Sequence, residues 1–118
     1  MKLRERILKL SLRILNDEGF ANLKVERLTQ DLEISKGNLN YYFPKKDDIL
    51  IALFKEYNQK MLDFADSLEP EKFTVKIYRD ALLEMFSIIR KYRGLVFAAA
   101  TLASPRDVLR EMNERFQL

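Results

Sequence analysis

The chain has 118 residues, which is enough for one domain with a modest core or for two small helical lobes. Its hydrophobic content of 47% and charged content of 33% are those of an ordinary folded protein, and only three glycines and three prolines interrupt the helical patterns. Cysteine and histidine are absent, which excludes disulfides, thiolate metal ligands and histidine-dependent catalysis, and the formal charge of +3 does not by itself indicate a nucleic-acid partner.

Strand patterns are scarce, and the acidic residues are scattered along solvent-type helix faces with no paired acid/base site. We therefore predict an all-α protein. We expect that it is not an enzyme and has no catalytic residues, no metal site and no cofactor.

The first predicted helix covers residues 2–18, because its apolar residues repeat at the spacing of one helical face: Leu3, Ile7, Leu10 and Ile14. Basic residues occupy the remaining surface: Lys2, Arg4, Arg6, Lys9 and Arg13. This surface is either simply solvated, which we favour, or lies along a phosphate backbone, with the N-terminal end as the expected point of contact. Gly19 is expected to take the left-handed conformation that ends a helix, with Phe20 packing back onto it.

Two short helices with a tight break between them follow. The first covers residues 24–32 and has apolar residues at helical spacing: Val25, Leu28 and Leu32. The break falls at Glu33 and Ile34. Ser35 suits the N-cap of the next helix, because its hydroxyl can accept from the exposed amides of the first turn. Pro44 ends that helix, because proline disfavours helical geometry in the residue before it.

The helix after Ser35 is too short and too polar to be a core helix. It is expected to bury Leu39 and Phe43 and to direct the other side chains outward: Lys36, Gly37, Asn38, Asn40 and Tyr41. The major groove of DNA admits one α-helix, whose N-terminal side chains then meet base edges. Lys36 can donate to guanine or to a phosphate, and Asn38 and Asn40 can read adenine. We therefore predict that the two short helices form a DNA-reading helix-turn-helix.

Three side chains on or beside this outward face fit phosphate groups. Tyr41 and Tyr42 can donate to phosphates through their hydroxyls, although each is alternatively a partly buried core aromatic. Lys46 lies at the start of a fourth helix, residues 45–68, where its charge adds to exposed amides and makes a phosphate clamp.

The later part of the chain is predicted from wide apolar patterns. A fifth helix follows Pro70 and carries one stripe: Val75, Tyr78, Leu82, Met85, Phe86 and Ile89. Gly94 breaks this pattern, and residues 95–103 are expected to be almost wholly buried and are too short to span a bilayer. Ser104 and Pro105 begin a last helix whose apolar residues are Val108, Leu109, Met112 and Phe116. The sequence stops inside this pattern, so we expect either a chain cut short of its natural end or a last helix that needs a partner. No N-terminal export signal is apparent, which leads us to expect a cytoplasmic location.

An ordered string of residues carries a family resemblance. It consists of Ile7 with Leu8, Gly19 with Phe20, Leu28, and the run ISKGNLNYYFPKKDDIL from Ile34, which includes Lys46. Through this string, residues 7–50 resemble the N-terminal DNA-binding domain of the TetR family of bacterial transcriptional regulators. The resemblance covers over a third of the chain. The later helices are similar to that family's ligand-binding and dimerisation domain but carry no signature of their own.

The resemblance implies a helix-turn-helix domain at residues 1–46 and a helical regulatory domain, expected to be incomplete, at residues 47–118. It implies a homodimer on a palindromic DNA operator that usually represses and is released by a small-molecule inducer, with no membrane partner. The implied DNA-binding residues are Lys24, Lys36, Gly37, Asn38, Asn40, Tyr41, Tyr42 and Lys46. Candidate ligand-pocket residues are Phe54, Tyr57, Met61, Tyr78, Phe86 and Phe97, each of which is alternatively an ordinary core residue.

The sequence departs from the family pattern at several positions. Glu33 stands in place of a turn glycine, which costs on the order of 1 kcal/mol if the residue is left-handed. Asn40 replaces a usual tyrosine, and small alanines are replaced by Ser11, Thr29 and Leu32. These departures and the small net charge leave open an alternative: a helical protein-interaction module that retains the fold without operator binding.

Overall fold

The computed structural model describes residues 1–101, 110, 113 and 114. The helices in chain order are α1 (Leu3–Asp17), α2 (Val25–Leu32), α3 (Lys36–Tyr42), α4 (Lys46–Asp66), α5 (Val75–Lys91) and α6 (Arg93–Thr101), with short 3₁₀ turns at Phe20–Asn22 and Pro70–Lys72. No strand occurs in these residues, so the predicted all-α class is confirmed. None of the described helices is both long and apolar enough to cross a membrane.

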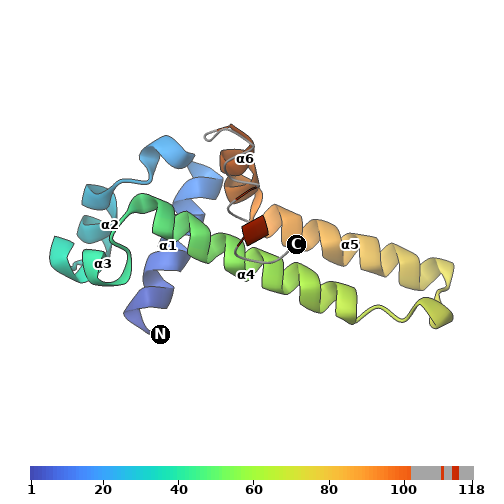
Figure 1. Ribbon diagram of the computed structural model, residues 1–118. Helices are drawn as coiled ribbons and strands as arrows, with labels where there is room; N and C mark the ends of the chain where they lie inside the picture. Colours follow the sequence, from blue (N-terminus) through green and yellow to red (C-terminus); the bar gives the residue numbers. More distant parts are fainter. Residues whose placement is uncertain (102–109, 111–112, 115–118) are drawn as a thin grey trace.

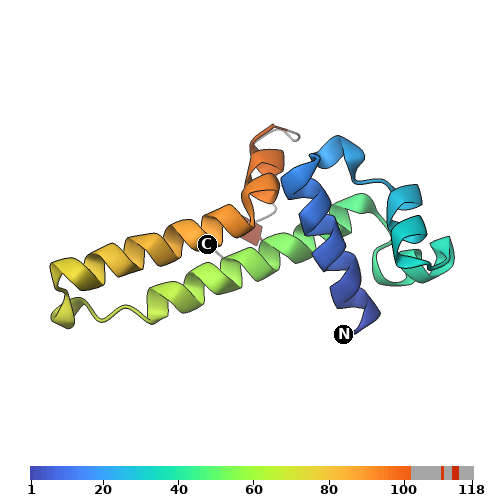
Figure 2. The same cartoon turned by 180° about the vertical axis from the view of Figure 1, so that it is seen from behind.

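The helices form a small lobe and a long hairpin (Figure 1). α1 packs against α2 and against α4, α3 packs against α2, and α4 then leaves the lobe and runs antiparallel to α5. α6 turns away from the hairpin at the end of α5 and lies beside the C-terminal end of α1, which is seen from behind in Figure 2. α3 is therefore at the far end of the molecule from the tip of the hairpin.

One hydrophobic cluster holds the lobe together. α1 contributes more buried side chains to this cluster than any other helix, among them Ile7, Leu8, Ile14 and Leu15. Leu28 of α2, Leu39 of α3 and Leu53 of α4 each have 2% or less of their surface exposed and join the same cluster. Full burial of such a side chain contributes roughly 1.5–3 kcal/mol, so these contacts fix where α3 lies.

The same cluster extends beyond residue 46 into the hairpin. Ile49 and Leu53 of α4 belong to it, as do Tyr92 and Leu95 at the junction of α5 and α6. Tyr92 is the largest fully buried side chain in the described part of the chain. The lobe formed by α1, α2 and α3 therefore shares its core with α4 and α6.

Several sequence-based expectations about the later helices were wrong in detail. α4 ends at Asp66 instead of residue 68. The helical pattern was expected to break at Gly94, but the break between α5 and α6 falls at Tyr92 and Gly94 lies inside α6. In residues 95–101 only Leu95 and Ala98 are buried, and Phe97 is 70% exposed. The predicted stripe of α5 is partly open to solvent, because no other described helix covers Val75, Tyr78 and Phe86. The predicted last helix, with Ser104, Pro105, Val108, Leu109, Met112 and Phe116, lies outside the described residues.

Candidate nucleic-acid interface

α3 starts at a side-chain cap and is anchored by two apolar residues. The hydroxyl of Ser35 accepts a hydrogen bond from the Asn38 amide at 3.0 Å, as the sequence predicted. Leu39 is 2% exposed and Phe43 is 5% exposed, which confirms the predicted anchor. The helix ends before Pro44, so a short, fixed element presents its other side chains outward.

The outward face of α3 is polar and accessible. Its exposed residues are those expected from the sequence: Lys36, Gly37, Asn38, Asn40 and Tyr41. Tyr41 is 80% exposed, whereas Tyr42 is 38% exposed and therefore partly buried, and neither belongs to the core cluster. Their rings meet edge to face with centroids 5.0 Å apart, which orients both hydroxyls without burying them. The face therefore offers ammonium, amide and phenol groups from consecutive turns of one helix.

The turn between α2 and α3 contains the one non-glycine residue with positive φ in the described part of the chain. Glu33 has φ 55° and ψ 46°, in the left-handed region that a glycine would occupy more easily. The Glu33 amide donates to the Gln30 carbonyl at 3.3 Å and the Ile34 amide donates to the Thr29 carbonyl at 3.1 Å. This is the Schellman pattern that ends a helix, so Glu33 does take the left-handed conformation whose cost was considered from the sequence.

Lys46 at the start of α4 has partners inside the lobe. Its ammonium donates to the Phe20 carbonyl at 3.0 Å and lies 3.8 Å from the centre of the Phe20 ring. Burial lowers the pKa of Lys46, the charge of Lys24 lowers it further, and Asp47 opposes both effects. The side chain thus fastens the segment after α1 to α4, and the helix start is capped separately by Asp48, whose carboxylate accepts from the Lys45 amide at 2.9 Å.

Lys24 and Arg4 lie near the outward face of α3, at two other points of the lobe. Lys24 is exposed and stands immediately before α2, where its backbone is extended and its side chain makes no capping bond. The Arg4 guanidinium lies 5.5 Å from the centre of the Phe43 ring, so the N-terminal end of α1 reaches the end of α3. Both cations are therefore placed at the margin of the lobe end that carries α3.

Arg27 makes a contact that the sequence reasoning missed. Its guanidinium forms a two-point ion pair with Glu18, at 2.9 and 2.8 Å, and a third bond to Asp31 at 2.7 Å. The hydrogen bond from Arg27 lowers the pKa of Glu18. The spacing of four residues between Arg27 and Asp31 signals their pair, whereas the bond to Glu18 depends on how α1 and α2 pack.

The six candidate ligand-pocket residues do not share one environment. Phe54, Tyr57 and Met61 of α4 are half-buried, and the ring of Tyr57 lies 5.4 Å from that of buried Tyr92. Tyr78, Phe86 and Phe97 are more than half exposed. A groove of about 300 Å³ between α4 and α5 is lined by other residues, among them Phe64 and Ile88.

Comparison with known proteins gives a consistent picture. A sequence model described as bacterial regulatory proteins, tetR family, matches residues 7–53. The chain is 31% identical over 98 residues to the fatty acid metabolism regulator protein of Bacillus subtilis (strain 168), a match that covers 83% of this chain and 47% of the relative. It is 34% identical over 90 residues to an uncharacterized HTH-type transcriptional regulator in the dhlA 5′ region of Xanthobacter autotrophicus, covering 76% of this chain and 43% of the relative.

A solved structure extends the similarity to the whole fold. The crystal structure of a TetR-family transcriptional regulator from Marinobacter aquaeolei VT8 superposes with a TM-score of 0.82 at 32% sequence identity, covering 98% of this chain and 59% of that one. The chain spans about half the length of the curated relatives it matches.

Proposed function

Because this chain belongs to the TetR family of bacterial regulatory proteins, we propose that it is a transcriptional regulator that binds operator DNA through α3. The observation that carries the proposal is the outward face of α3, where five exposed residues surround an anchor of two buried ones. A helix placed in this way can enter the major groove, and its amides and ammonium match base-edge donors and acceptors.

The residues have separate roles in this proposal. Lys36, Asn38 and Asn40 read base edges, and Gly37 allows the helix backbone to approach them closely. Tyr41 and Tyr42 bind phosphates through their hydroxyls. Lys24 binds a phosphate by charge at the margin of the face. Lys46, whose ammonium is held by Phe20, contributes positive potential at the start of α4 and reaches a phosphate only by exchanging that bond.

We further propose that the regulator is a homodimer that represses from a palindromic operator and is released by a small-molecule inducer. The helix-turn-helix unit at residues 1–46 binds DNA, and the helices from residue 47 onward form the regulatory part. Half-sites then recur roughly 34–36 Å apart, or at a multiple of that distance. The inducer is expected among the later helices, with Phe54, Tyr57 and Met61 as the half-buried candidates.

The test is selection of bound duplexes from a random pool at low salt, followed by affinity measurements on the enriched site. The Lys36→Glu variant is expected to fold normally and to lose DNA binding. Lys76→Glu makes the same charge change at an exposed position of α5 and is expected to retain DNA binding. The logarithm of the binding constant is expected to fall with the logarithm of salt concentration by about 0.9 for each phosphate neutralised. Equal affinities of the two variants would contradict the role of α3.

The alternative function is a helical protein-interaction module. It is favoured by the net charge of only +3 and by Asn40 and Glu33, where the chain departs from the family pattern. Failure to enrich any palindrome at low salt would favour this module over a DNA-binding regulator.

A further inference from the structure

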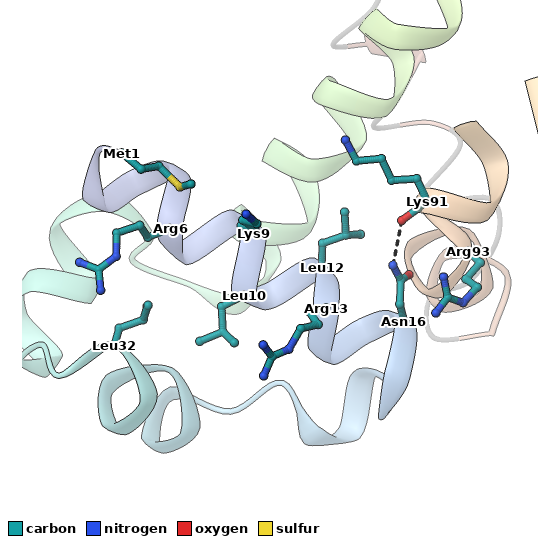
Figure 3. Close-up of a pocket in the computed structure, with 10 residues that line it drawn as sticks. All are labelled: Met1, Arg6, Lys9, Leu10, Leu12, Arg13, Asn16, Leu32, Lys91 and Arg93. Atoms are coloured by element: carbon teal, nitrogen blue, oxygen red, sulfur yellow. Dashed lines mark hydrogen bonds between the residues drawn. The ribbon is translucent and has the colours of Figure 1, made fainter. Parts of the chain in front are cut away.

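A groove with a strongly positive rim lies along α1, on a different face from the outward residues of α3. Its volume is about 510 Å³, and it is bounded by α1, Leu32 of α2 and the junction of α5 with α6 (Figure 3). Pockets that hold small organic ligands have volumes of roughly 300–1,000 Å³, so this one has the capacity for such a ligand.

The charge of the groove is all of one sign. Five cationic side chains line it and no acidic side chain does: Arg6, Lys9, Arg13, Lys91 and Arg93. Arg93 is paired with Asp17 at 3.2 Å. The other four form no salt bridge within the part of the chain that the structure describes. The nearby Glu18 interacts electrostatically with Arg13, but its contact ion pair is with Arg27.

The cations surround an apolar floor. Leu10 and Leu32 are half-buried and Leu12 is nearly buried, and all three line the groove. In Figure 3 the guanidinium groups of Arg6 and Arg13 lie on either side of Leu10, on the side of α1 that faces Leu32. A planar, fork-shaped guanidinium group can bind an oxyanion at two points, while the leucines accept an apolar body.

We propose that this groove binds an amphiphilic anion, a molecule with a phosphate or carboxylate head and an alkyl body. The head binds at the guanidinium groups of Arg6 and Arg13, and the body covers Leu10 and Leu32. A DNA backbone satisfies the charge but has no apolar group with which to cover the leucines, so a small ligand fits the groove better. The site is separate from α3, and its test does not require DNA binding.

The groove also reaches the junction of the lobe with the hairpin, through Lys91 and Arg93. Lys91 ends α5, and its pKa is lowered first by the neighbouring Lys60 ammonium and then by burial. A ligand in the groove adds negative charge to a cavity that Lys91 also lines, so its binding is expected to stabilise the folded chain. The expected consequence is a higher melting temperature of the full chain in the presence of the ligand.

The experiment is titration calorimetry of the 118-residue chain with octyl phosphate below its micelle concentration, with inorganic phosphate and with uncharged octyl glucoside. We expect octyl phosphate to bind and inorganic phosphate to bind at least about tenfold more weakly, because burial of a few methylenes is sufficient for that difference. Octyl glucoside is expected not to bind. In methyl NMR spectra the resonances of Leu10 and Leu32 are expected to shift with octyl phosphate.

A matched pair of double variants locates the site. Arg6→Gln/Arg13→Gln removes two charges from the groove and is expected to weaken octyl phosphate binding by about tenfold or more. Lys55→Gln/Lys76→Gln removes two exposed charges elsewhere, from α4 and α5, and is expected to leave binding unchanged. Equal affinities of the two variants, or equal binding of octyl phosphate and inorganic phosphate, would overturn the proposal. So would a loss of duplex DNA affinity in Arg6→Gln/Arg13→Gln without any octyl phosphate binding, because the groove would then serve DNA.

Discussion

The side chain of Asn16 bonds to the Gly94 amide across the junction of the two parts of the molecule. Its Oδ1 accepts from the Gly94 N–H at 2.8 Å, and its Nδ2 donates to the Lys91 carbonyl, also at 2.8 Å. The side-chain amide of one residue of α1 thus bonds to a backbone carbonyl in the last turn of α5 and to a backbone amide in the first turn of α6. The chain changes direction at Tyr92, between these two bonds, so Asn16 fixes the angle at which α6 leaves the hairpin.

Asn16→Ala is expected to destabilise the fold by about 1–3 kcal/mol, because it leaves the part-buried Gly94 amide without its partner and removes the bond to the exposed Lys91 carbonyl. Urea unfolding followed by circular dichroism measures the change. Asn22→Ala is the control, since Asn22 makes one local bond, to the exposed Glu18 carbonyl. A cost no larger for Asn16→Ala than for Asn22→Ala would show that the junction does not depend on this side chain.

Gly94→Ala is expected to be more damaging than its helical position suggests. A Cβ at residue 94 would collide with the Leu15 carbonyl and come within 2.6 Å of the Asn16 amide, so α6 would have to move away from α1. In the exposed interior of a helix the same change would be favourable by about 1 kcal/mol. Thermal unfolding of the purified variant measures the sign of the effect.

Gly37→Ala supplies the comparison, because Gly37 is also helical and a Cβ there meets only the Ser35 hydroxyl at 3.8 Å. We expect Gly37→Ala to raise the melting temperature and Gly94→Ala to lower it. If both variants gained stability, the close contact between α1 and α6 would not be present in solution.

Ser11→Ala is expected to stabilise the protein. Ser11 is fully buried in α1, and its hydroxyl has no hydrogen-bond partner among the described residues. Removing an unsatisfied buried hydroxyl recovers about 1–3 kcal/mol of desolvation cost and also favours the helix. The midpoint of urea unfolding measures the gain, and Ser87→Ala, at an exposed position in α5, is the control that reports helix propensity alone.

The local parts of this structure could be predicted from the sequence, and the parts that depend on distant neighbours could not. Ser35 as a cap and Leu39 with Phe43 as the anchor follow from patterns within a few positions. Asn16 bonds to residues 75 and 78 positions away, and nothing in the local pattern indicates those partners.

Burial in the later helices is equally non-local. The pattern of residues 95–103 is apolar on all sides, which predicts burial, yet Phe97 faces solvent because only one side of α6 packs against α1 and the hairpin. For the candidate interface, the exposed face of α3 could be predicted from the helical period. The position of Lys46 could not, because its partner, the Phe20 carbonyl, is brought to it by the packing of α1 against α4.

Glu33→Gly is expected to stabilise the turn before α3. The left-handed conformation costs a non-glycine residue about 1–2 kcal/mol, and glycine adopts it without that cost, although it loses more conformational freedom on folding. We therefore expect a net gain of about 0.5–1 kcal/mol, measured by urea unfolding. Glu26→Gly inside α2 is the control and is expected to be destabilising, because glycine weakens a regular helix.

The ion pair of Arg27 with Glu18 is expected to make the stability depend on pH in the acid range. The hydrogen bond from Arg27 lowers the pKa of Glu18 in the folded state, so the unfolded chain takes up a proton at Glu18 before the folded one does. The stabilisation is therefore present above the ordinary glutamate pKa of about 4.3 and is lost as the pH falls through the lower folded value. Arg27→Gln removes the hydrogen bond that lowers the pKa of Glu18. The difference in melting temperature between wild type and variant is therefore expected to shrink as the pH falls below the ordinary glutamate pKa. Arg79→Gln, which breaks the more exposed and longer pair with Asp80 at 3.7 Å, is expected to show no such pH dependence. A constant difference between wild type and Arg27→Gln from neutral to acid pH would mean that Arg27 acts through packing and leaves the proton affinity of Glu18 unchanged.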